Sequence, residues 1–241
     1  MSARAAIRTT GIVVALASEA RTLTHASKPD SITALAGGAA LYLTGMGPAA
    51  ARRGAHALAD AGAASLAVFG VAGALSSQLR NGTLFCPERV LDEDGHAFAT
   101  DSAWRAGLQQ RLAPSLRMEG ALLSVASPLL TPVDKAAAHQ RCAALAVDME
   151  SAAVAAVALE RGLPFVVLRA IVDEAGDAIP AVLNGSVDPF GRPRPLQLMV
   201  ALCGHPSVLR ELPQLYSRMQ RATQALRAAA EATGPTLGWH R

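Results

Sequence analysis

The sequence has little of the residues on which nucleic-acid binding depends. It contains only two lysines among 241 residues, Lys28 and Lys135, and aromatic residues make up 4% of the chain. Nucleic-acid-binding chains usually carry blocks of basic residues with interleaved aromatics. Here the arginines are scattered along the chain and the formal net charge is only +3. We therefore expect no nucleic-acid partner.

Cysteine and histidine are also sparse. The three cysteines, at positions 86, 142 and 203, lie far apart and outside any C-x-x-C spacing, and the six histidines show no ligand spacing. This argues against a disulfide framework and against zinc or another metal. The glycine pair at positions 45 and 47 lacks the third glycine of a dinucleotide-binding fingerprint. We expect neither a metal nor an organic cofactor.

Long hydrophobic runs are missing as well. No segment approaches the ~20 apolar residues that span a bilayer. The apolar run at residues 11–17 is too short for a signal peptide. Hydrophobic residues nevertheless make up 51% of the chain, which is ample for a packed core. We expect one reduced, cytoplasmic domain over residues 1–241, with a divergent C-terminal segment from about residue 181.

Short apolar runs alternate with helical patterns along the chain. The sequence predicts buried strands over residues 12–16, 41–43, 65–69, 83–91, 121–126 and 165–172. It predicts helices over residues 48–61, 133–140, 148–161 and 207–233, the last broken near Pro213. This alternation is typical of an α/β fold with a largely parallel sheet covered by helices.

Three acidic residues stand where α/β enzymes place their sites. Glu19 follows the first strand, Glu150 begins a helix and Asp173 follows the strand at residues 165–172. Taken singly, each is more commonly a helix cap or a solvated turn. Glu150 shares its predicted helix face with apolar residues, where a carboxylate is costly to bury without partners. The hydroxyl groups of a ribose could satisfy it, since an ionised carboxylate accepts several hydrogen bonds.

Five segments of the chain resemble, in order, the motifs of the purine nucleoside phosphorylase and methylthioadenosine/S-adenosylhomocysteine nucleosidase superfamily. They are residues 11–19, 44–47, 70–73, 147–153 and 169–173. The resemblance covers roughly residues 11 to 180. It implies a three-layer α/β/α sandwich with a mixed, barrel-like central sheet, a small purine nucleoside as the ligand, and a homo-oligomer.

The resemblance also implies roles for the matching positions. Asp173 would give a proton to N7 of the purine, Met149 would pack on the ribose, and Glu150 would bind its hydroxyls and stabilise positive charge on the sugar. Glu19 would orient or deprotonate an attacking water. The remaining substrate-binding positions would be Gly47, Val71, Ala72, Gly73 and Val172.

The nucleophile is the main alternative that the sequence leaves open. Phosphorylases of the superfamily hold phosphate with an arginine before the turn at Gly70 and a hydroxyl after it, and here those positions are Val68 and Val71. Water is therefore favoured over phosphate. A phosphate site built from other arginines stays open, with Arg52, Arg53 or Arg169 as candidates.

Four stretches are most similar to the hopanoid-associated branch of the superfamily, which is thought to remove adenine from adenosylhopane. They are residues 146–151, 171–180, 191–194 and 206–213. Apolar residues between positions 196 and 202 would line a channel for such a substrate, or would simply belong to the core. A lipid-like substrate implies peripheral contact with the inner membrane. The alternatives are a methylthioadenosine/S-adenosylhomocysteine nucleosidase, a phosphate-dependent phosphorylase, or a nucleoside-binding module without catalysis.

Overall fold

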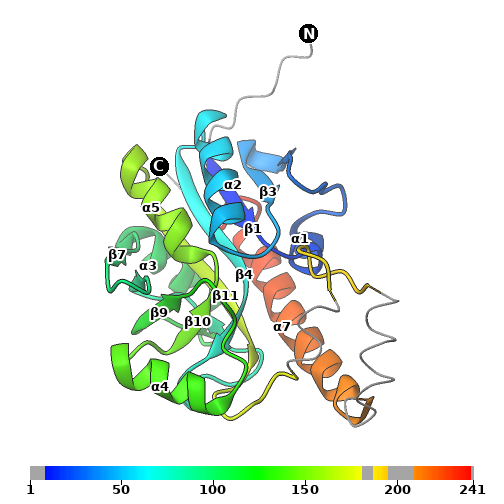
Figure 1. The fold of residues 1–241 in the computed structure, drawn as a ribbon. Helices are drawn as coiled ribbons and strands as arrows, with labels where there is room; N and C mark the ends of the chain where they lie inside the picture. The colour runs from blue at the N-terminus through cyan, green and yellow to red at the C-terminus, as the bar shows by residue number, and fades with distance from the viewer. Residues whose placement is uncertain (1–8, 181–186, 195–208, 240–241) are drawn as a thin grey trace.

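The computed structural model describes residues 9–180, 187–194 and 209–239. Its central feature is a mixed sheet built around two long parallel strands, β4 and β11 (Figure 1). The strands are β1 (Thr10–Val14), β2 (Ile32–Ala34), β3 (Ala40–Leu43), β4 (Ser65–Ala74), β5 (Leu84–Phe85), β6 (Arg89–Leu91), β7 (Ala97–Ala99), β8 (Leu116–Arg117), β9 (Ala121–Ser124), β10 (Ala146–Asp148) and β11 (Phe165–Asp173).

The strand pairings close part of the sheet into a ring. Strand β4 pairs with β1, β10 and β11, β11 pairs with β5, and β5 pairs with β8. Hydrogen bonds from Cys86 to Arg117 and from Glu88 to Gly120 continue the pairing past Pro87 into β6 and β9. Because β9 pairs with β10, the ring returns to β4. The prediction of a mixed, barrel-like sheet is confirmed.

Helices cover both faces of this sheet. They are α1 (Ala17–Leu23), α2 (Pro48–Asp60), α3 (Ser102–Leu112), α4 (Pro132–Cys142), α5 (Ser151–Arg161) and α7 (Leu212–Thr233), with one short 3₁₀ turn, η1 (Ala36–Gly38). Figure 1 shows α2 and α5 side by side and the long helix α7 on another side of the sheet. Of the helices that the structure describes, none combines the length and the apolar character needed to cross a membrane.

Two hydrophobic clusters show why the sheet needs helices on each face. In β1, Val13 belongs to the cluster beneath α2 and α5, whereas Ile12 and Val14 belong to the cluster beneath α1, α3 and α7. This alternation follows from the two-residue period of a strand. Helix α2 lies so close to β3 that a Cβ at Gly54 would be 3.0 Å from the ring of Tyr42 and would clash with Thr44, which follows the strand. The three-layer arrangement that the sequence implied is confirmed.

Several predicted boundaries were wrong, each for a tertiary reason. The strand predicted for residues 65–69 runs on to Ala74, because β11 and β10 hydrogen-bond its small residues. The strand predicted for residues 83–91 is divided at Pro87, which lacks an N–H to donate. The helix predicted from residue 148 begins at Ser151, since residues 146–148 form β10 beside β9.

The structure tests only some of the predictions made for the C-terminal segment. Pro213 lies in the first turn of α7 and does not break the helix. Proline is tolerated there because the N–H that it lacks would have no hydrogen-bond partner within the helix. The apolar residues at positions 196–202, proposed to line a substrate channel, lie outside the described residues.

Candidate active site

A cavity of about 220 Å³ opens at the ends of β1, β4, β10 and β11. All but one of the predicted site residues line it, namely Glu19, Val71, Ala72, Gly73, Met149, Glu150, Val172 and Asp173. The remaining lining residues are mostly apolar: Ala15, Leu16, Met46, Val125, Pro128, Leu129, Val147, Asp148 and Ile179. The exception among the predicted residues is Gly47, which takes part through its backbone.

Glu19 lies in the first turn of α1, and its side chain is fixed by the backbone of two other elements. Glu19 is only 2% exposed. The backbone N–H of Leu16 donates to one carboxylate oxygen at 2.8 Å, and the N–H of Val71 in β4 donates to the other at 2.7 Å. Burial raises the pKa of Glu19 to about 7, although Arg169 and the two N–H groups act to lower it. A carboxylate with this pKa can take up a proton near neutral pH.

Arg169 is the centre of a buried ionic cluster beside Glu19. It lies in the middle of β11 and is 1% exposed. Its Nε and Nη2 donate to Oδ2 of Asp148 at 3.0 and 2.5 Å, and Nη2 also donates to Oε2 of Glu150 at 3.0 Å. Although burial lowers the pKa of Arg169, the two carboxylates raise it overall. The guanidinium therefore stays charged and compensates two carboxylates that would otherwise be costly to bury.

Glu150 lies immediately before α5 and not on an apolar helix face as the sequence suggested. Glu150 is the N-cap residue of α5. Its Oε1 accepts a hydrogen bond from the backbone N–H of Gly47 at 3.0 Å. Gly47 has a φ of 98°, which glycine adopts without strain. Burial raises the pKa of Glu150 and the charge of Arg169 lowers it.

Asp173 is the last residue of β11 and lines the same cavity. Its Oδ2 accepts a hydrogen bond from the Nζ of Lys135 in α4. Burial raises the pKa of Asp173, whereas the Lys135 ammonium lowers it. A Cβ at Gly73 would lie 2.9 Å from Oδ2, so a glycine in β4 makes room for the carboxylate. The result is a carboxyl group that is buried, fixed and more basic than an exposed aspartate.

Sequence reasoning missed three members of this site: Asp148, Arg169 and Lys135. A signal exists for Arg169, since it is a charged residue inside an otherwise apolar strand pattern, but the sequence offers it only as a candidate phosphate ligand. The structure shows its Nε and Nη2 bound to carboxylates. No local pattern marks Lys135, because α4 carries several other polar residues and the partners of Lys135 lie 38 or more residues away.

The other residues considered for phosphate do not form a site at this cavity. Val68 is buried in the core and does not line the cavity, whereas Val71 does. Arg52 and Arg53 are exposed on α2, and neither lines the cavity.

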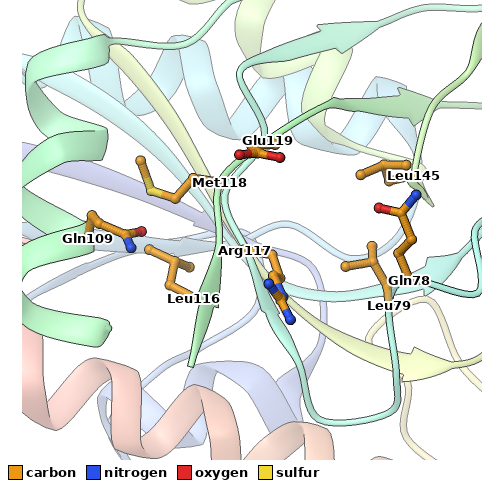
Figure 2. A pocket seen from close by; sticks show the side chains of 8 residues that line it. All are labelled: Gln78, Leu79, Gln109, Leu116, Arg117, Met118, Glu119 and Leu145. Carbon is orange, nitrogen blue, oxygen red and sulfur yellow. The ribbon is translucent and has the colours of Figure 1, made fainter. Parts of the chain in front are cut away.

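A second, larger hollow of about 520 Å³ lies elsewhere in the fold and contains none of the predicted residues. It is lined by Gln78, Leu79, Gln109, Leu116, Arg117, Met118, Glu119 and Leu145. Figure 2 shows the side chains of Arg117 and Glu119 pointing away from each other, and both are exposed to solvent. This hollow brings together no pair of buried charged groups, so size alone does not make it the site.

Only one group of side chains in the described part of the chain could gather around a metal ion. Asp92, Asp94 and His96 lie in the turn between β6 and β7. Asp94 and His96 are exposed, and Asp92 already binds the His96 ring at 2.8 Å. None of them lines the candidate cavity.

Comparisons with known proteins agree on the fold. The family model described as the phosphorylase superfamily matches residues 13–190. A search of curated proteins finds no match. Among solved structures, a 5′-methylthioadenosine/S-adenosylhomocysteine nucleosidase from Colwellia psychrerythraea in complex with adenine superposes with a TM-score of 0.68 at 20% identity, covering 96% of this chain and 95% of that one.

Two Helicobacter pylori structures are similar to the chain to a comparable degree. Futalosine hydrolase gives a TM-score of 0.64 at 17% identity, covering 92% of this chain and 97% of that one. A 5′-methylthioadenosine/S-adenosylhomocysteine nucleosidase complexed with a substituted pyrrolidin-3-ol gives 0.65 at 16% identity, with the same coverage. At these identities the likeness describes the fold.

Proposed function

Because the chain belongs to the phosphorylase superfamily of nucleoside phosphorylases and nucleosidases, we propose that it cleaves the N-glycosidic bond between a ribose and a purine base. The observation that carries this proposal is the composition of one cavity. It holds a buried aspartate, Asp173, a buried carboxylate cluster around Arg169, and Glu19 fixed by two backbone N–H groups. Cleavage of this bond needs an acid for the base, negative charge near the sugar and a positioned nucleophile.

Asp173 serves the leaving base. A purine anion is a poor leaving group, and protonation at N7 lets it leave neutral. The pKa of Asp173 is raised by burial, which favours the protonated form that can give this proton. Its Oδ2 is held by Lys135, which leaves Oδ1 for the base.

The carboxylate cluster serves the sugar. As the bond to the base breaks, positive charge develops on the ribose ring, and fixed carboxylates stabilise such charge more strongly in a dry cavity than in water. Glu150 is held by Gly47 and Arg169, so its position does not depend on the substrate. Met149 lines the same cavity and offers an apolar surface for the ribose.

Glu19 serves the nucleophile, which we propose to be water. Both of its carboxylate oxygens are fixed, and its pKa of about 7 suits a group that accepts a proton from water near neutral pH. The nearby guanidinium of Arg169 already binds Asp148 and Glu150. Phosphate would have to compete with these two carboxylates, which disfavours phosphorolysis.

For the substrate we propose a 5′-modified adenine nucleoside, with adenosylhopane as the specific candidate. The resemblance to the hopanoid-associated branch supports it, and so does the apolar lining of the cavity. Met46 is 37% exposed and also lines a neighbouring hollow of about 460 Å³ that includes Phe190, so apolar surface continues outward from the cavity. A cytoplasmic homo-oligomer with peripheral contact at the inner membrane would fit such a substrate.

The test is product analysis with adenosylhopane, methylthioadenosine and adenosine, each with and without phosphate. We expect free adenine and an unphosphorylated ribosyl product, at a rate that phosphate does not change. Formation of a ribose 1-phosphate product only with phosphate would replace hydrolysis by phosphorolysis. Turnover of methylthioadenosine but not adenosylhopane would overturn the specific substrate. No adenine from any of them would favour a nucleoside-binding module.

The pH dependence of catalysis gives a prediction for Glu19. Because Glu19 must be ionised to accept a proton, kcat/KM of the wild type is expected to fall as the pH drops below about 7. Glu19→Gln should lower kcat/KM by roughly 10²-fold, since a general base contributes at least that much, and should remove this acid limb. A limb of unchanged position in Glu19→Gln would show that another group titrates.

Glu19 also makes the stability of the fold depend on pH. Its pKa rises from an ordinary value of 4.5 to about 7 in the folded chain. The bound proton therefore stabilises the fold fully below the unfolded-state pKa, and this contribution is lost as the pH rises through about 7. We expect the free energy of unfolding, measured in urea, to fall more steeply between pH 5 and 8 in the wild type than in Glu19→Gln.

A further inference from the structure

We propose that Lys135 is a positioning residue for proton transfer, whose ammonium group holds Asp173 in place and compensates the negative charge that Asp173 acquires when its proton leaves for the purine. This inference rests on the proposed function, because it assigns Lys135 a role through the proton donor of that reaction. Lys135 is one of the two lysines of the chain and is 1% exposed.

Three hydrogen bonds fix the ammonium group of Lys135. An ammonium group has three N–H donors. One binds Oδ2 of Asp173, and the other two bind the backbone carbonyls of Glu174 and Asp177, each at 2.9 Å. These carbonyls belong to the segment that directly follows Asp173. Lys135 therefore fixes both the carboxyl group and the backbone that carries it.

The charge of Lys135 bears on the chemistry of Asp173. Burial raises the pKa of Asp173, which keeps the carboxyl group protonated but also makes its proton harder to give up. Lys135 acts in the opposite direction, since its charge and its hydrogen bond both lower that pKa. A fixed charge next to the atom where negative charge develops is the arrangement that stabilises a transition state.

The other charged groups near Asp173 form ion pairs among themselves. Asp177 raises the pKa of Asp173 and Arg218 in α7 lowers it, but these two are paired at 2.6 Å. Glu174 is bound to Arg80 at 2.6 Å on an exposed part of the surface. The remaining charged residues of the site, Glu19, Asp148, Glu150 and Arg169, interact with one another.

The proposed step balances without a change at Lys135. The proton on Oδ1 of Asp173 passes to N7, the electron pair of the glycosidic bond moves to the base, and the base leaves neutral. Asp173 becomes a carboxylate against the Lys135 ammonium. Water adds its oxygen to the sugar carbon and one of its protons passes to Glu19. Exchange with solvent then removes that proton from Glu19 and returns one to Asp173.

The test compares two leaving groups in Lys135→Met and Lys135→Gln. Adenine needs an acid to leave, whereas the p-nitrophenolate of p-nitrophenyl ribofuranoside leaves without one. We expect kcat for adenine release to fall by roughly 10- to 100-fold, a part of what a general acid contributes, while p-nitrophenol release changes little. The alkaline limb of the kcat profile for adenine release should move to higher pH, because Asp173 loses the neighbour that lowers its pKa.

Matched variants separate this role from a structural one. Lys28→Met removes the exposed lysine and should behave as the wild type. Adding Lys135→Met to Asp173→Asn should cause no further loss of adenine release, since residues that act through one group are not additive. Lys135→Gln keeps a buried donor without the charge, so it supplies the comparison if Lys135→Met does not fold.

Three outcomes would overturn the proposal. They are equal losses for both leaving groups, no loss for adenine, or an additive loss in the double variant. Failure of the proposed function would look different, because the wild type itself would then release no base from any purine nucleoside.

Discussion

Asp173→Asn is expected to lower kcat for release of a purine base by about 10²- to 10⁴-fold, the contribution typical of a general acid. The asparagine side chain can still accept the hydrogen bond of Lys135, but it has no proton that it can give to N7. KM should change little, because the shape of the cavity is kept. Steady-state kinetics with a 5′-modified adenine nucleoside would measure both constants.

The matched control for this prediction is Glu174→Gln. Glu174 is the next residue in the chain, yet it binds the exposed Arg80 and the N–H of Asn81 instead of lining the cavity. It should retain wild-type kcat within about threefold, as expected where no transition-state interaction is lost. Asp173→Asn should also retain release of p-nitrophenol from its riboside. Near-wild-type adenine release by Asp173→Asn would show that another group protonates the base.

Arg169→Met is expected to lower the free energy of unfolding by about 3–5 kcal/mol, the usual cost of breaking a buried ion pair on one side. The change would leave Asp148 and Glu150 buried without their cation. Burial raises the pKa of Glu150, and the variant would lose the Arg169 charge that lowers it. Because protonation of Glu150 would then relieve part of the deficit, the deficit should shrink as the pH is lowered from 8 to 5. Urea unfolding at several pH values would measure it.

Arg161→Met is the control for a charge pair at the surface. Arg161 ends α5 and pairs with Asp60 at 2.8 Å, and the two side chains are 37% and 60% exposed. Such pairs contribute ~0–1 kcal/mol. Similar losses in the two arginine variants, or a deficit in Arg169→Met that does not depend on pH, would contradict the role of Arg169 as the counter-ion of the cluster.

Elements with a strong local pattern were predictable. Pro48 at the start and small residues along one face predicted α2 almost to its last residue, and the apolar run from Phe165 predicted β11. Elements that depend on a partner were not. The three residues of β10 form a strand because β9 and β4 pair with them. The glycines of β4 are extended because β11 and β10 pair with that strand. Their own residues express no strong preference.

The sequence by itself determined the fold class and the approximate places of Glu19, Glu150 and Asp173, because the burial period of a strand or helix and its end signals are local properties. Only the tertiary structure decided which charges meet. Arg169 lies 21 residues from Asp148, and Lys135 lies 38 residues from Asp173. Such pairs form through strand register and helix packing, which join distant segments. The chemistry of a buried charged group depends on the partners beside it, because they shift its pKa.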